Sequence, residues 1–156
     1  KREMTENNSK HVILVVEDDE DDYFLISSTL KKTEFDCDVH WVKNGEEAMG
    51  YLLRQNEWQD PIKSPVPSLI FLDINLPKKN GFEVLQEMQQ HPALKNLLTV
   101  VLTSSKNKAN VVAAYDFGAN SYVQKPSQMD QFTKGLQLIM KYWFQLVEYP
   151  FRTVRG

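Results

Sequence analysis

The sequence predicts an α/β fold, a doubly wound parallel sheet of five strands with helices on both faces. Short apolar runs alternate with segments of helical periodicity along the chain, which is the pattern of βαβ units. Four of these runs are followed at once by carboxylate, hydroxyl or ammonium side chains. Because the carboxyl ends of parallel strands converge on one crevice where ligands bind, these side chains are expected to form one site.

Two apolar runs and two helical segments open the chain. The runs Val12–Val16 and Val39–Val42 are short and continuous, as buried strands are. Between them, apolar residues recur on one helical face, at Tyr23, Ile26 and Leu30. Asn44 with Glu47 three residues later is a variant of the capping box that opens the second helix. Residues 54–67 carry three prolines and no periodicity, so they are expected to form a long loop.

The remaining three strands are predicted at Ser68–Leu72, Thr99–Thr103 and Ser121–Lys125. A turn at Leu76–Gly81 follows the first of them. It leads into a helix whose apolar positions are Phe82, Leu85 and Met88.

The last two helices have recognisable ends. One spans about Asn107–Phe117 and stops at Gly118, a residue type common just past a helix end. Ser127 with Asp130 is expected to open the other as a capping box. Its apolar residues recur at alternating steps of four and three, at Phe132, Leu136, Ile139, Trp143 and Leu146. The prediction is five strands and five helices in strict alternation.

Composition narrows the class of protein. A chain of 156 residues suits one domain with its own core. A net charge of −3 gives no general basic footprint for nucleic acid. The single cysteine, Cys37, excludes an internal disulfide and fits a reducing cytoplasm. No apolar stretch is long enough for a membrane span, and residues 1–10 are polar, so they are expected to form a flexible tail rather than a signal peptide.

Carboxylates gather behind two of the strands. The six acids Glu17–Asp22 follow the first strand, and Asp73 follows the third. Like charges so close together disfavour ionisation unless a cation shares them. Mg²⁺ is the expected cation, because it is bound by a few carboxylates and waters. Its expected ligands are Glu17, Asp18 and Asp73, with the backbone carbonyl of Asn75 as a further candidate.

Each of these residues also has a simpler explanation. Acids favour the first turn of a helix, and this is the expected explanation for Asp21 and Asp22. Asp73 alone could be a turn residue, Thr103 alone a helix cap, and Lys125 alone a solvated side chain. Their joint occurrence, each at a strand end, favours a functional site.

An aspartate beside a metal can act as a nucleophile toward a phosphoryl group. The metal, Lys125 and the Thr103 hydroxyl would then stabilise the charge on the phosphoryl oxygens. A phosphoryl group on Asp73 adds about −1.5 to −2 charge by analogy with other phosphorylated side chains. Thr103 and Lys125 are the groups most able to move with it. Tyr122 is most simply a half-buried strand aromatic, and its functional interpretation is a rotamer switch.

At this point the chain resembles the receiver domains of two-component response regulators. The segments that carry the resemblance are Ile13–Asp18, Leu69–Pro77 with Gly81, Val101–Ser104 and Tyr122–Pro126. It covers about His11–Lys141. The resemblance implies a flavodoxin-like sheet of order 2-1-3-4-5, with a receiver domain at residues 11–147 and an extension at 148–156. It also implies a signalling protein rather than an enzyme, limited to self-phosphotransfer and autodephosphorylation.

The resemblance assigns roles to seven residues. They are Asp73 as the phosphoacceptor, Glu17 and Asp18 as the metal-binding acids, Asn75 as the carbonyl donor to Mg²⁺, Thr103 as the switch hydroxyl, Lys125 as the phosphate-binding lysine, and Tyr122 as the switch aromatic. Many receivers carry aspartate at the position of Glu17, and the longer side chain could alter metal affinity.

Three regions narrow the resemblance further. The insertion Gln55–Pro67, the turn Leu76–Gly81 and the tail Trp143–Pro150 look like those of the response regulators of cyanobacterial phytochromes. Those regulators are single-domain dimers that accept phosphate from a light-sensing histidine kinase. Because few residues follow Leu146, a stand-alone regulator that signals by binding a partner is expected. A homodimer through the last helix and the aromatic tail is expected, with a tail folded back on its own domain as the alternative.

Two other functions remain as alternatives. A pseudo-receiver would bind partners without phosphorylation, and the intact set of acids, hydroxyl and lysine argues against it. A Mg²⁺-dependent phosphohydrolase of the haloacid-dehalogenase type carries Asp-x-Asp after its first strand. Here the corresponding motif is Asp73-Ile74-Asn75, in the middle of the chain.

Overall fold

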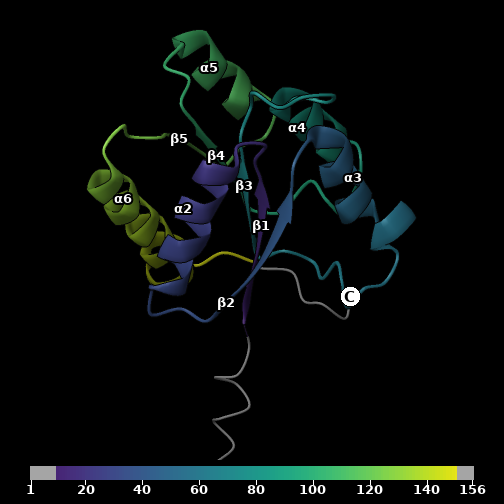
Figure 1. Cartoon of the computed structure of the whole chain (residues 1–156). Helices are drawn as coiled ribbons and strands as arrows, with labels where there is room; N and C mark the ends of the chain where they lie inside the picture. The colour runs from purple at the N-terminus through teal and green to yellow at the C-terminus, as the bar shows by residue number, and fades with distance from the viewer. Residues whose placement is uncertain (1–9, 151–156) are drawn as a thin grey trace, which may run out of the picture.

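A computed structural model describes residues 10–150 of the chain (Figure 1). Most of the expected tail 1–10 and residues 151–156 of the expected extension lie outside this range. The described residues form one parallel sheet of order β2-β1-β3-β4-β5, which confirms the predicted fold. Its strands are β1 (His11–Val16), β2 (Cys37–Val42), β3 (Leu69–Leu72), β4 (Thr99–Thr103) and β5 (Ser121–Gln124).

Helices cover both faces of this sheet. The helices are α2 (Glu20–Lys31), α3 (Gly45–Leu53), α4 (Gly81–Gln89), α5 (Lys108–Asp116) and α6 (Met129–Lys141), with a short η1 (Asn56–Trp58) and a π-helical turn η2 (Tyr142–Leu146). In Figure 1, α2 and α6 lie together on one side of the sheet, and α3 and α4 lie on the other. None of the helices within residues 10–150 is long and apolar enough to cross a membrane.

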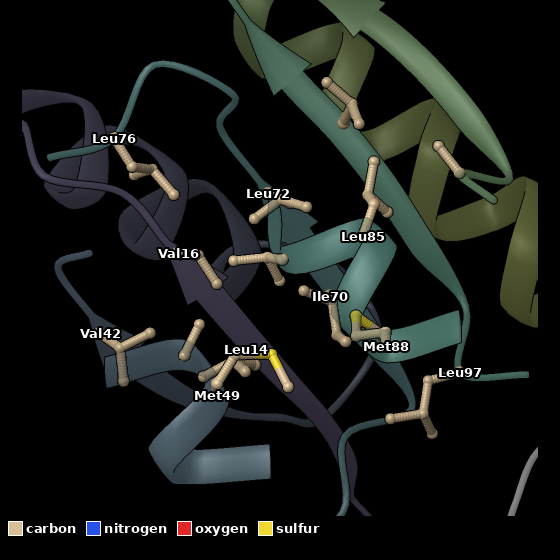
Figure 2. Close-up of a cluster of buried hydrophobic side chains, with 14 of the residues drawn as sticks. Leu14, Val16, Val42, Met49, Ile70, Leu72, Leu76, Leu85, Met88 and Leu97 are labelled. Carbon is tan, nitrogen blue, oxygen red and sulfur yellow. The ribbon is translucent and has the colours of Figure 1, made fainter. Parts of the chain in front are cut away.

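The central strands β1, β3 and β4 are mostly apolar because both faces of the sheet are covered there, whereas the edge strand β2 carries Asp38 and His40. Residues of β3 alternate between the two layers, since successive side chains of a strand point to opposite faces. Leu69 and Phe71 join the core under α2 and α6. Ile70 and Leu72 join the core under α3 and α4, where Figure 2 shows them beside Leu85 of α4. The domain therefore has two apolar layers with the sheet between them.

Strand register places the polar residues that follow the strands. Val16 of β1 pairs with Leu72 of β3, so the next residues, Glu17 and Asp73, emerge side by side. The Lys125 amide donates to the Thr103 carbonyl at 2.8 Å, which joins the ends of β4 and β5. The convergence expected at the carboxyl ends of the strands is thus present.

Most predicted helix ends agree with the structure. Asn44 accepts a hydrogen bond from the Glu47 amide at the start of α3, and the Glu47 carboxylate accepts one from the Lys43 amide. Asn107 caps α5. Gly118 follows that helix with φ of 107°, a conformation that L-residues with side chains rarely adopt. The long loop at residues 54–67 is interrupted only by the short η1.

The capping box predicted at the start of the last helix is wrong. The N-cap of α6 is Gln128, and it makes no side-chain cap bond. The Asp130 carboxylate accepts a hydrogen bond from the adjacent Gln131 amide, so it does not reach back to Ser127. The helix begins after the serine, which leaves Ser127 too early in the chain to cap it.

The segment after α6 packs on its own domain. The Phe144 ring lies 4.1 Å from the His11 ring between centroids, at the start of β1. The Tyr149 hydroxyl donates to the Asn96 carbonyl at 3.1 Å. Trp143 and Tyr149 meet edge to face. The described part of the tail therefore follows the alternative of folding back, while Phe151, another tail aromatic, lies outside the described residues.

Candidate functional site

Three carboxylates meet at the ends of β1 and β3. Oxygen atoms of Glu17, Asp18 and Asp73 lie within 4.8 Å of one another. Glu17 and Asp73 are buried, and Asp18 is exposed. Hard divalent cations prefer oxygen ligands in such an arrangement. The donor set and its spacing therefore fit one divalent cation, which Glu17, Asp18 and Asp73 would hold.

The backbone after β1 turns sharply into α2. The Asp19 carboxylate accepts a hydrogen bond from the Asp22 amide at 3.1 Å and so caps the helix. The Asp19 amide in turn donates to the Glu17 carboxylate at 3.2 Å. The acidic run is therefore divided, since Asp19 serves the helix while Glu17 and Asp18 face Asp73.

Lys125 brings a positive charge to these acids. Its Nζ lies 2.7 Å from Glu17 Oε1, 2.8 Å from Asp22 Oδ2 and 3.5 Å from Asp73 Oδ2. The Lys125 side chain is only 8% exposed. The sequence placed Asp22 in the first turn of a helix, which the structure confirms, but it did not indicate that Asp22 is also a direct partner of Lys125. The available signal was its place in the first turn of α2, four residues after Asp18.

Burial acts on the pKa of both members of the central ion pair, Glu17 and Lys125. Burial, helped by the nearby charge of Asp73, raises the pKa of Glu17 to about 7 despite the hydrogen bond from Lys125. Burial alone would lower the pKa of Lys125. The hydrogen bonds to Asp22 and Glu17 outweigh burial and raise that pKa above its usual value. Lys125 is therefore a permanent cation, while Glu17 exchanges its proton near neutral pH.

The raised pKa of Glu17 predicts a pH-dependent stability. Between the ordinary pKa of 4.5 and the folded pKa of about 7, the folded protein binds this proton more tightly than the unfolded chain. The stabilisation from protonated Glu17 is thus present below pH 4.5 and is lost as the pH rises to about 7. Because Glu17→Gln removes the titration, we expect the variant to gain on the order of 1–3 kcal/mol over wild type across this interval.

Urea unfolding of wild type and Glu17→Gln at both ends of this interval, without divalent cations, measures the effect. A difference in unfolding free energy that does not change with pH would contradict the raised pKa of Glu17.

The other predicted site residues lie on or just after β3, β4 and β5. The Asn75 amide donates to Asp73 Oδ1 at 3.2 Å, and its side chain is exposed. Thr103 is fully buried at the end of β4, and its Oγ1 accepts from the Ser105 amide at 3.4 Å. The half-buried Tyr122 donates its hydroxyl to the Ser105 carbonyl at 3.1 Å. Thr103 and Tyr122 therefore hold the same loop through Ser105, a link that the sequence did not indicate.

An aromatic pair fixes the backbone of the first acid. Trp41 Nε1 donates to the Glu17 carbonyl at 2.7 Å. The Tyr23 ring stacks on the Trp41 ring at 4.0 Å with an interplanar angle of 3°. The sequence placed Tyr23 on one face of a helix and gave no role to Trp41, so it did not indicate this pair. The pair holds the chain where β1 ends, and this restricts the position of the Glu17 carboxylate.

Comparison with known proteins agrees with this geometry. The sequence model of the response regulator receiver domain matches residues 13–137. The response regulator Rcp1 of Synechocystis sp. is 40% identical over 145 residues, which are 93% of this chain and 97% of that protein.

Solved structures of response regulators are also similar to this chain. The crystal structure of the Mn²⁺-bound form of response regulator Rcp1 superposes with a TM-score of 0.82 at 40% identity, covering 90% of this chain and 99% of that one. The phosphorylated cyanobacterial phytochrome response regulator RcpA superposes with a TM-score of 0.85 at 34% identity, covering 91% and 99%. The chain therefore belongs to the response regulator receiver family.

Proposed function

We propose that this receiver accepts a phosphoryl group from a histidine kinase onto Asp73 and signals by phosphorylation-dependent partner binding. The observation that carries the proposal is the meeting of three carboxylates with the Lys125 ammonium at one end of the sheet. The proposed receiver domain spans residues 11–147, with 148–156 as an extension, and it would act in the cytoplasm beside its kinase.

Mg²⁺ is the proposed cofactor, held by Glu17, Asp18 and Asp73 with the backbone carbonyl of Asn75. The clustered oxygens support this assignment, because they suit a hard divalent cation. When bound, the ion would supply Lewis-acid stabilisation of the phosphoryl oxygens. Removal of the metal is therefore expected to stop phosphoryl transfer.

In the proposed step, a carboxylate oxygen of Asp73 attacks the phosphorus of a phosphohistidine. An O–P bond forms, the N–P bond breaks, and its electron pair stays on the imidazole nitrogen. The Asn75 amide orients the Asp73 carboxylate through its hydrogen bond to Oδ1. Lys125 neutralises part of the charge on the phosphoryl oxygens. Thr103 and Tyr122 are both hydrogen-bonded to Ser105. As switch residues, they would transmit the phosphorylation of Asp73 to this loop.

Incubation with acetyl phosphate and Mg²⁺, followed by intact mass measurement, tests the proposal. We expect a gain of one phosphoryl group, prevented by a metal chelator. A chain that gains none but still binds partners would be a pseudo-receiver. Continuous release of inorganic phosphate over many turnovers would instead indicate a phosphohydrolase.

A phytochrome-type sensor kinase is the proposed phosphodonor. The similarity to the phytochrome response regulator RcpA supports this partner. Phosphoryl transfer from such a kinase, changed by red and far-red illumination, would support the assignment. Transfer that is indifferent to light would reject it without affecting the role of Asp73.

We also propose a homodimer through α6 and the segment after it. Leu138, Tyr142 and Leu146 follow one another at steps of four and are 67%, 47% and 75% exposed. Such a spacing places them on one side of the helix. Clustered exposed apolar residues usually mark an interface. The packing of Phe144 on His11 restricts the proposed interface to this outer stripe.

Sedimentation velocity at micromolar concentration is expected to give dimer mass for wild type. Leu138→Glu with Leu146→Glu should give monomer, because two charges would be buried in the interface. Val112→Glu is the matched control, since Val112 is 61% exposed on α5, outside the stripe. Monomeric wild type would reject the dimer.

A further inference from the structure

Lys125 has three acidic neighbours, and they lie at different distances from its ammonium group. Two carboxylates lie at hydrogen-bond distance, Glu17 Oε1 at 2.7 Å and Asp22 Oδ2 at 2.8 Å, whereas Asp73 Oδ2 is at 3.5 Å. The Lys125 side chain is 8% exposed, so little water can replace a lost partner. The ammonium therefore rests closer to Glu17 and Asp22 than to the proposed phosphoacceptor.

The two resting partners differ in what else they do. Glu17 belongs to the carboxylate cluster that fits a divalent cation, together with Asp18 and Asp73. Asp22 stands outside that cluster, on the first turn of α2, and its side chain is 38% exposed. A cation in the cluster would compete with Lys125 for Glu17 but not for Asp22. Asp22 is thus the partner that can keep Lys125 in place when the cluster is filled.

A phosphoryl group on Asp73 would add negative charge on the other side of the ammonium. Nζ, now 3.5 Å from Asp73 Oδ2, would be attracted toward that group, and the bond to Asp22 at 2.8 Å opposes this attraction. An ion pair with one partly exposed member is weak. The Asp22–Lys125 ion pair is therefore strong enough to weaken the attraction of Lys125 to the phosphoryl group, but not to prevent their contact.

We propose that Asp22 is a positioning residue that holds Lys125 on the α2 side of the pocket and thereby limits how tightly the pocket binds a phosphoryl group at Asp73. This inference rests on the proposed phosphoacceptor function of Asp73. It gives a regulatory role to an acid that the sequence explained only by its place in the first turn of a helix.

Beryllofluoride with Mg²⁺ is the probe, because BeF₃⁻ becomes tetrahedral when an aspartate oxygen binds its beryllium and so forms a stable mimic of an aspartyl phosphate. The concentration for half-saturation is measured by amide NMR for wild type and variants. We expect Asp22→Asn to bind about two- to fivefold more tightly, which is the effect of removing one weak ion pair. Asp22→Glu keeps a carboxylate that can reach Lys125, so it should restore wild-type affinity.

Asp21→Asn is the matched control. Asp21 lies on the same turn of α2 and is exposed, so the variant makes the same change in net charge. Equal gains in beryllofluoride affinity in Asp21→Asn and Asp22→Asn would show that the change in net charge alone causes the effect. This result would overturn the proposal. Unchanged or weaker binding in Asp22→Asn would also overturn it.

Two further outcomes are separable. Wild type that binds no beryllofluoride would reject the phosphoacceptor function itself, whereas equal binding in wild type and Asp22→Asn rejects only the role of Asp22. Urea unfolding checks that each variant is folded. Asp22→Ser serves as the second carboxylate-free variant, with the same expected gain, if Asp22→Asn does not fold.

Discussion

Asp73→Asn is expected to abolish phosphorylation by acetyl phosphate. The amide has no carboxylate oxygen to form the O–P bond, and its nitrogen is a poor nucleophile because it is conjugated with the carbonyl. The side chains have the same shape, and Asp73 is 8% exposed at the end of β3, so the fold should be retained. Intact mass should show one added phosphoryl group on wild type and none on the variant.

A second acid variant controls for general loss of charge. Asp116 lies at the exposed end of α5, away from the three-carboxylate cluster, so Asp116→Asn should be phosphorylated like wild type. Equal phosphorylation of wild type and Asp73→Asn would place the acceptor elsewhere. In that case the proposed function would fail at its central residue.

Gly81→Ala is expected to destabilise the domain by about 2–3 kcal/mol, because overpacking in a closely packed site costs that much. A Cβ at Gly81 would lie 2.5 Å from the Asp73 carbonyl oxygen and 2.7 Å from the Ile74 Cα. Both are backbone atoms, so no flexible side chain can move aside. The Gly81 amide also donates to the Ile74 carbonyl at 3.1 Å, which fixes the start of α4 against this loop.

The same substitution should slow phosphorylation, since relief of the clash must displace the backbone of Asp73. Gly135→Ala is the matched control, because a Cβ there meets nothing within 4 Å in the middle of α6. It should stabilise the protein by about 0.5–1 kcal/mol through helix propensity. Urea unfolding of both variants measures the two effects. Equal stability of Gly81→Ala and wild type would show that the backbone at Asp73 and Ile74 can move to accommodate a Cβ at little energetic cost, which would contradict the prediction.

The fold was largely predictable because its central strands are buried on both faces. Such strands appear as continuous apolar runs, and each predicted run coincides with an observed strand to within a few residues. The approach of Glu17 to Asp73 was predictable for the same reason, since parallel strands end together. The start of α6 was not, because Ser127 and Asp130 match a capping pattern without the backbone geometry that it needs.

Contacts between side chains from distant segments were beyond sequence reasoning. Asp22 and Lys125 are separated by 103 positions, and Trp41 and Glu17 by 24. Their hydrogen bonds depend on side-chain direction as well as on strand order. The packing of the tail was equally hard to predict. Its many aromatic residues were evident in the sequence, but the surface that covers Phe144 depends on where α6 ends and on the position of His11.

A single strand joins the two ends of the domain. His11, at the first position of β1, meets the C-terminal aromatic Phe144, and Glu17 directly follows the last position. Ile13–Val16 between them are at most 1% exposed, so this stretch has no room to bend. Six strand residues span about 20 Å. A molecule that binds the C-terminal segment and an ion that binds in the pocket would therefore act on opposite ends of the same rigid strand.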